Sequence, residues 1–85
     1  MAIELLYFAW VREAIGCDGE TIEPPADVAD VAGLIGWLAA RGGGYAGALS
    51  DPDRLRCAID QRFMGLDSPI AGAREIAIFP PVTGG

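Results

Sequence analysis

The sequence predicts an α+β fold in which one main helix covers one face of a mixed β-sheet. Hydrophobic residues make up 52% of the 85 residues, which is enough to build the core of a single domain. Two apolar runs, residues 3–10 and 75–79, are rich in the branched and aromatic residues typical of strands. Between them, apolar residues recur at the i, i+3, i+4, i+7 spacing of an amphipathic helix, from Val31 to Leu38.

The first third of the chain reads as a strand, a helical turn and a second strand. In residues 3–10 both alternating faces are largely apolar, which favours a central strand covered on both sides. Residues 11–16 suit a single helical turn closed by Gly16. Residues 20–23 alternate and stop at two prolines, so we expect the second arm of a hairpin near a sheet edge.

The main helix is expected to begin at Asp27, whose side chain can cap it. The triple glycine at residues 42–44 should end this helix. Gly33 and Gly36 lie inside the helix at a cost of about 1 kcal/mol each relative to alanine. We interpret them as sites of close packing against a neighbouring element.

The second half of the chain supplies the remaining elements. Residues 45–49 suit a weak second helical turn, residues 55–60 a third strand, and residues 63–64 a short further strand. The strand at residues 75–79 is, with the first, the most apolar, so these two should pair at the centre. The resulting order, β-β-α-β-(β)-β, predicts a β-grasp, ubiquitin-like fold with four to five strands.

The charge composition excludes several classes of function. Twelve acidic residues against six arginines give a net charge of −6, so nucleic acid is not expected as a partner. The chain has no histidine and no lysine, which removes the usual general base near neutral pH and Schiff-base chemistry. We therefore expect a protein that is not an enzyme by itself and binds no metal. The five acids from Asp18 to Asp30 are interpreted as a solvated face.

The cysteines and the hydropathy point to a soluble, cytoplasmic protein. Cys17 and Cys57 show no zinc-binding spacing. Cys57 is expected to be buried and inert, whereas Cys17 lies in a turn and is expected to be exposed. No apolar run approaches the roughly 20 residues that span a bilayer, and the N-terminus does not resemble a signal peptide.

The C-terminal residues are the most informative part of the chain. The strand at residues 75–79 leads into two prolines, which cannot donate to a sheet ladder, so we expect a β-grasp domain over residues 1–79 and a flexible tail over residues 80–85. Extended, the tail spans roughly 20 Å. Its last two residues have no side chains, which suits insertion into a narrow channel. The residues expected to insert are Pro80, Pro81, Val82, Thr83, Gly84 and Gly85.

The three phenylalanines are candidates for a docking surface. If Ile3 and Ile76 face the helix, strand alternation directs Phe8 and Phe79 outward, and Phe63 can join them from the short strand. An exposed aromatic cluster at the root of the tail would mark a partner-binding site.

Three segments of the chain resemble the MoaD family of sulfur carriers, the small subunits of molybdopterin synthase. Residues 79–85, FPPVTGG, are close to the family's terminal signature. Residues 9–16 resemble the family's segment after the first strand, including its Arg-Glu pair, and residues 58–61 resemble the segment that ends the third strand. Family members commonly have asparagine at the position of Asp60.

The resemblance implies a mechanism centred on the carboxylate of Gly85. A ubiquitin-activating-type adenylyltransferase would adenylate it with ATP, and the adenylate would be converted to a thiocarboxylate. The tail would then enter the large synthase subunit and donate sulfur to cyclic pyranopterin monophosphate in molybdenum cofactor biosynthesis. Phe8, Phe63 and Phe79 would dock on both partners. ATP, zinc and the pterin would belong to the partners, so no cofactor is expected on this chain, and a heterotetramer of two small and two large subunits is implied.

Three other interpretations share parts of this pattern. A thiamine-pathway sulfur carrier would have the same fold and Gly-Gly end. A ubiquitin-like protein modifier would join Gly85 to a lysine of a target protein. A plain interaction module would leave the tail inert.

Overall fold

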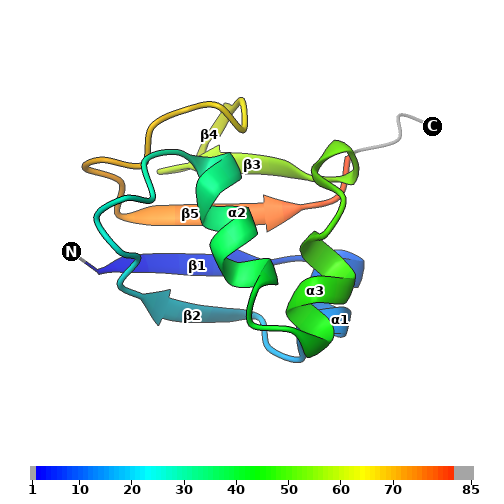
Figure 1. Ribbon diagram of the computed structural model, residues 1–85. Coiled ribbons are helices and arrows are strands. Elements are labelled where there is room, and N and C mark those ends of the chain that lie inside the picture. Colours follow the sequence, from blue (N-terminus) through cyan, green and yellow to red (C-terminus); the bar gives the residue numbers. More distant parts are fainter. Residues whose placement is uncertain (1, 82–85) are drawn as a thin grey trace.

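The structure, a computed structural model that describes residues 2–81, is a five-stranded mixed sheet with helices packed on one face (Figure 1). The strand order across the sheet is β2-β1-β5-β3-β4. In chain order, the elements are β1 (Ile3–Tyr7), α1 (Ala9–Ile15), β2 (Gly19–Ile22), α2 (Val31–Ala39), α3 (Gly43–Leu49), the 3-10 turn η1 (Pro52–Arg54), β3 (Arg56–Ile59), β4 (Arg62–Met64) and β5 (Glu75–Phe79).

The pairing confirms the predicted β-grasp arrangement. The first and last strands, β1 and β5, pair in parallel at the centre, and β2 forms an antiparallel edge strand on β1. On the other side of the sheet, β3 pairs antiparallel with both β5 and β4. The α2 helix crosses the middle of the sheet, whereas α1 and α3 lie together beyond the end at which β5 terminates (Figure 1).

The predicted boundary between the first strand and the first helix was wrong. We expected a strand through Trp10, but β1 ends at Tyr7 and Trp10 already belongs to α1. The turn between them is made at Ala9, whose φ of +55° is uncommon for a residue other than glycine. The predicted end of this helix is confirmed, because Gly16 adopts φ +95° and donates its N–H to Arg12 O at 2.9 Å.

The cap of the main helix is Asp30 rather than Asp27. Asp30 accepts a hydrogen bond from Gly33 N–H at 2.7 Å, and α2 begins only at Val31. The helix cannot begin earlier because the chain before it is held extended: Asp30 bridges to Pro69, and Ile70 N–H donates to Ala29 O at 3.1 Å.

The glycine that lets two helices approach closely is Gly44, not Gly33 or Gly36 as we expected. A Cβ on Gly36 would have no neighbour within 4 Å, so the close-packing interpretation was wrong there. On Gly33 the nearest atom would be its own helix cap, Asp30 Oδ1, at 3.1 Å. A Cβ on Gly44 would instead collide with the backbone of Ala14. Gly44 therefore allows α3 to approach α1. Residues 43–49 form a helix of seven residues, rather than the weak turn predicted over residues 45–49.

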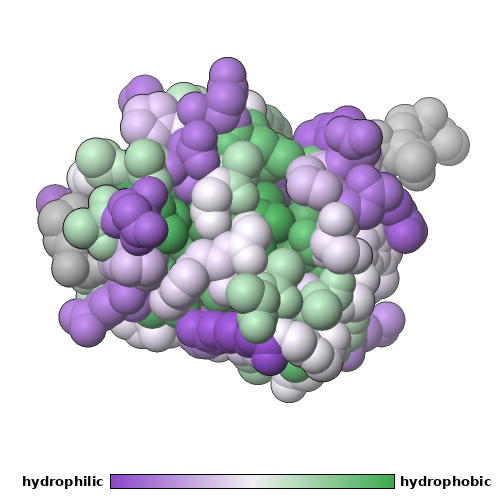
Figure 2. Space-filling model, viewed as in Figure 1, coloured by the Kyte–Doolittle hydropathy of each residue, from purple (hydrophilic) through white to green (hydrophobic). Residues whose placement is uncertain are grey.

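The core fills the layer between the sheet and the helices. It contains no buried charged or polar side chain among the described residues. Its members come from the three helices, from every strand except β4 and from the loops: Ile3, Leu5, Tyr7, Val11, Ile22, Val31, Leu34, Ile35, Leu38, Ala48, Leu49, Leu55, Cys57, Ile70, Ala73, Ile76 and Ile78. Figure 2 shows the helix-covered side, where hydrophilic residues lie mainly around the outline and hydrophobic surface shows nearer the middle. The described residues include no helix long and apolar enough to cross a membrane.

Candidate docking surface

The face of the sheet opposite α2 carries a row of apolar side chains. The register places Leu6 opposite Ala77, Ala77 opposite Ala58, and Ala58 opposite Phe63, so one row crosses four strands. Strand alternation adds a phenylalanine at the end of β1 and another at the end of β5. We call these six residues the apolar strip: Leu6, Phe8, Ala58, Phe63, Ala77 and Phe79.

The three phenylalanines lie on this open face, where alternation predicted them. Phe63 is 82% exposed and Phe8 is 46% exposed, whereas Phe79 is half-buried. The rings of Phe63 and Phe79 meet edge to face, with 5.8 Å between centroids and an interplanar angle of 64°. Exposed aromatic rings grouped on one face are typical of protein interfaces. Their role in docking stays a prediction.

The apolar strip ends where the chain leaves the sheet toward its C-terminus. Phe79 is the last residue of β5, and Pro80 and Pro81 follow it, both half-buried. Phe8 lies beside this exit, since its N–H donates to Ile78 O at 3.3 Å. The remaining residues predicted to insert into a partner, Val82, Thr83, Gly84 and Gly85, lie outside the described residues.

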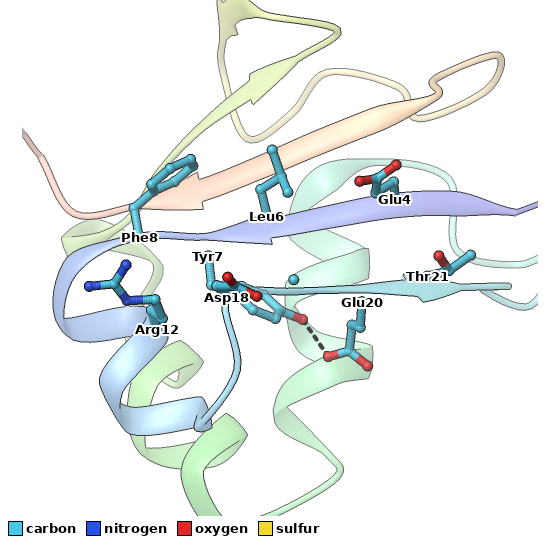
Figure 3. A pocket seen from close by; sticks show the side chains of 9 residues that line it. Glu4, Leu6, Tyr7, Phe8, Arg12, Asp18, Glu20 and Thr21 are labelled. Carbon is cyan, nitrogen blue, oxygen red and sulfur yellow. Dashed lines mark hydrogen bonds between the residues drawn. The ribbon is translucent and has the colours of Figure 1, made fainter.

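A groove of about 530 Å³ runs along β1 and β2 and extends the apolar strip toward the sheet edge. Figure 3 shows Leu6, Phe8 and Glu4 on one side of β1, with Arg12 of α1 next to Phe8. Gly19 lies in the groove opposite Leu6, and a Cβ there would lie 2.7 Å from Leu5 O. Sequence reasoning did not find this groove, because it depends on how α1 folds back beside β1.

A hydrogen-bonded cluster on the helix side of the sheet was also missed. Glu20 Oε2 accepts hydrogen bonds from the hydroxyls of Tyr7 at 2.8 Å and Tyr45 at 2.6 Å. Its Oε1 pairs with Arg41 Nη1 at 2.9 Å. Glu20 is therefore not part of a solvated acidic face. The sequence contained one clue to this cluster, because a buried tyrosine needs a polar partner. Glu20 stands opposite Leu5 in the hairpin register, on the same face of the sheet as Tyr7.

The cluster shifts the pKa values of its members in directions that favour the ionised carboxylate. Burial alone would raise the pKa of Glu20, but the hydrogen bonds from Tyr45, Arg41 and Tyr7 outweigh it and lower the pKa. Burial, reinforced by the hydrogen bond to Glu20, raises the pKa of Tyr7. Arg41 also lies over the rings of Trp37 and Tyr45, at 5.2 and 5.0 Å from the centroids. These contacts connect β1, β2, α2 and α3 and stabilise the fold.

Asp60 connects the β3–β4 turn to the start of β5. Asp60 and Gln61 have φ of +49° and +70°, as the two-residue turn between β3 and β4 requires. The Asp60 Oδ1 atom accepts hydrogen bonds from the N–H groups of Arg74 and Glu75, each at 3.0 Å. The carboxylate thus holds the β3–β4 turn against the start of β5.

The cysteines offer no reactive centre. Burial raises the pKa of the Cys57 thiol, which donates a hydrogen bond to Met64 O at 3.2 Å. Cys17 is half-buried against the core rather than exposed as we predicted. Among residues 2–81 no group of His, Cys, Asp and Glu side chains is arranged to hold a metal ion.

Comparison with known proteins identifies relatives along the whole chain. Residues 5–85 match the ThiS family. Molybdopterin synthase sulfur carrier subunits from Escherichia coli and Haemophilus influenzae are each 41% identical over 83 residues, which cover 98% of this chain and 99% of each relative. A protein of the same name from Mycosarcoma maydis is 33% identical over 90 residues, covering 99% of this chain and 94% of the relative.

Two solved structures share the fold. The Haloferax volcanii HVO 2177 protein superposes with a TM-score of 0.73 at 27% identity, over 100% of this chain and 87% of that one. A chain from the complex of subunits 1 and 2 of the Helicobacter pylori molybdopterin-converting factor superposes with a TM-score of 0.63 at 23% identity, over 100% of both chains.

Proposed function

The chain belongs to the ThiS family, and from this membership we propose that it is the sulfur carrier subunit of a molybdopterin synthase. The observation that carries the proposal is the 41% identity to the Escherichia coli and Haemophilus influenzae subunits, which extends over nearly the full length of both chains. The apolar strip at the root of the C-terminal residues supports it, since a carrier must dock before its terminus can react.

The reacting group in this proposal is the C-terminal carboxylate of Gly85. A carboxylate oxygen attacks the α-phosphorus of ATP on an activating enzyme, and pyrophosphate leaves. Hydrosulfide then attacks the acyl carbon of the adenylate, and AMP leaves, so that the terminus becomes a thiocarboxylate. In the active site of the large subunit, the thiocarboxylate sulfur forms a bond to a carbon of cyclic pyranopterin monophosphate. Water then cleaves the acyl C–S bond, which leaves the sulfur on the pterin and returns Gly85 to a carboxylate.

The rest of the chain binds and positions that terminus. Phe8, Phe63 and Phe79 supply apolar contact area to both partners in turn. Pro80 and Pro81 restrict the unbound backbone and lower the entropy lost when the tail is ordered in an active site. Gly84 allows the backbone to pass through a narrow channel. In this proposal the domain formed by residues 1–79 carries residues 80–85 into the active sites of the partners.

The partners follow from the same proposal. One is a ubiquitin-activating-type adenylyltransferase that uses ATP. The other is the large synthase subunit, with which this chain forms a heterotetramer of two small and two large subunits. The Helicobacter pylori neighbour is itself described as a complex of subunits 1 and 2. The chain binds no cofactor of its own, is not catalytic alone and works in the cytoplasm.

An intact-mass measurement tests the proposal directly. The protein is incubated with the activating enzyme, ATP and a sulfur source, and its mass is measured. Replacement of one oxygen by sulfur at the C-terminus supports a carrier, whereas covalent attachment to other proteins supports a ubiquitin-like modifier. An unchanged mass supports an inert interaction module. A subsequent molybdopterin assay with the large subunit separates this chain from a thiamine-pathway carrier.

Deletion of Gly85 sharpens the test. We expect the shortened protein to accept no sulfur and to unfold at the same temperature as the full chain. The full chain with one residue added after Gly85 is the matched control, and it should also be inactive unless it is trimmed. Sulfur loading of the shortened protein, or of the extended protein without trimming, would contradict the assignment of the reacting group.

A further inference from the structure

Two glutamates face each other on the open face, next to the apolar strip. Glu4 of β1 stands directly opposite Glu75 of β5 in the parallel register, two positions before Leu6 and Ala77. Thr21 of β2 lies on the other side of Glu4. By alternation both carboxylates project on the side of the sheet away from α2. Like charges directly opposite each other destabilise a sheet, so this arrangement has a cost in the free protein.

Neither glutamate forms an ion pair among residues 2–81. Among residues 2–81 the one ion pair is between Arg41 and Glu20, on the other face. Arg74 lines a shallow hollow with Glu75 and Asp60 but forms no ion pair with either. The carboxylate of Asp60 adds a third negative charge beside Glu75, because Asp60 Oδ1 accepts a hydrogen bond from the Glu75 N–H at 3.0 Å.

The opposite end of the apolar strip carries positive charge. Arg56 stands directly opposite Phe79, and its guanidinium donates to the backbone oxygens of Asp53 and Leu55, not to a carboxylate. Arg12 borders the groove beside Phe8 (Figure 3). At about 3.3 Å per residue, Glu4 lies roughly 13 Å along β1 from Phe8. The open face is thus acidic at one end, whereas the charges of Arg12 and Arg56 outweigh that of Asp18 at the end where the chain leaves the sheet.

We propose that this charge difference sets the direction in which the open face docks on the large synthase subunit. Basic side chains of that partner lie over Glu4 and Glu75, and its active-site entrance lies at the Phe8–Phe79 end. The proposal rests on the proposed function and deepens it. Apolar contacts alone would allow the open face to bind the partner in either orientation. Complementary charges at the two ends of the apolar strip disfavour the orientation rotated by half a turn. The net charge of −6 also favours a partner with a basic surface.

The test compares two double variants that each remove two negative charges. Glu4→Gln with Glu75→Gln removes the facing pair, and Asp27→Asn with Asp67→Asn removes two exposed charges from loops outside the strands. Association of each with the purified large subunit is measured by stopped flow and calorimetry at low and high salt. We expect the facing-pair variant to associate about threefold to tenfold more slowly and to lose most of the salt dependence. The loop variant should change less than about twofold.

Thermal unfolding of the free protein supplies a second, independent readout. The facing-pair variant should be at least as stable as the wild type, because a repulsion has been removed. Slower association with unchanged or higher stability therefore supports docking, whereas lower stability would point to a structural role and overturn the proposal.

The failure of this proposal can be told from failure of the proposed function. If the facing-pair variant binds at the wild-type rate and with the wild-type salt dependence, while Phe79→Ala weakens binding, the inferred direction is wrong and the carrier role stands. If the wild-type protein does not bind the large subunit at any salt concentration, both proposals fall.

Discussion

The two faces of the sheet are built from alternate residues of the same strands, yet they differ in how deeply their side chains are buried and in how many of the polar ones have a hydrogen-bond or ion-pair partner. Under α2, Leu5 and Ile76 are fully buried, and the polar atoms of Tyr7 and Glu20 are hydrogen-bonded. On the open face, Phe63 is largely exposed, and the carboxylates of Glu4 and Glu75 face each other without an ion pair among the described residues. The covered face therefore accounts for stability, and the open face retains the unsatisfied groups that a partner can use.

Leu5 and Leu6 are neighbours on β1 and give the largest contrast between the faces. Leu5→Ala should lower the free energy of unfolding by about 2–5 kcal/mol, because Leu5 is completely buried beneath α2. Leu6→Ala should cost less than about 1 kcal/mol, since Leu6 lies half-buried on the open face. Chemical denaturation of both variants measures the difference. Equal losses would show that the open face contributes to stability as much as the covered face.

Gly44 and Gly36 compare a crowded with an open position on the helix side. Gly44→Ala should destabilise the protein by about 1–3 kcal/mol, because the new Cβ would collide with the backbone of Ala14 and push α3 from α1. Gly36→Ala should stabilise it by about 0.5–1 kcal/mol, because the site is open and alanine favours a helix. Thermal unfolding distinguishes them, and a shift of the same sign in both would contradict the assigned packing.

Phe79→Ala tests the open face as a docking surface. If Phe79 is a buried anchor in the complexes, its loss should weaken partner binding by about 1–3 kcal/mol. The effect on unfolding should be smaller than that of Leu5→Ala, because Phe79 is half-buried and its ring packs against the exposed Phe63. Calorimetry with the large subunit and with the activating enzyme measures the affinities. Unchanged affinity for both would remove Phe79 from the docking surface.

Glu20→Gln should produce the smallest change, and one that depends on pH. The folded-state pKa of Glu20 is lowered from the usual 4.5, so its ionisation stabilises the fold fully above pH 4.5. That stability is lost as the pH falls through the lower folded-state value. The variant should therefore show a weaker loss of stability on acidification than the wild type, by up to about 1 kcal/mol at this partly exposed pair.

Glu23→Gln serves as the control for this pH effect, because Glu23 is exposed and lies just beyond the same strand. Its acid unfolding should follow the wild-type curve. If Glu20→Gln and Glu23→Gln give the same pH profile, the hydrogen-bonded cluster does not account for the acid sensitivity.

Element boundaries were harder to predict than element types. The apolar run that begins in β1 continues through Trp10. The backbone nevertheless turns at Ala9, because α1 must fold back to pack Val11 into the core. Similarly, both Asp27 and Asp30 suit a helix cap. The helix begins after Asp30 because residues 29 and 30 are paired with the loop before β5. Neither the packing of Val11 nor the pairing of residues 29 and 30 can be recognised from the neighbouring residues in the sequence.

The sequence by itself determined the strand and helix types, the central pairing of the first and last strands, and the outward direction of Phe8, Phe63 and Phe79. These follow from periodicity and from the apolar composition of each strand, which are local properties of the chain. Only the tertiary structure decided that Glu20 joins Tyr7, Arg41 and Tyr45, that Gly44 is the crowded glycine, and that Glu4 faces Glu75. Each of these depends on the register and distance between segments far apart in the sequence, and those are set by packing of the whole core.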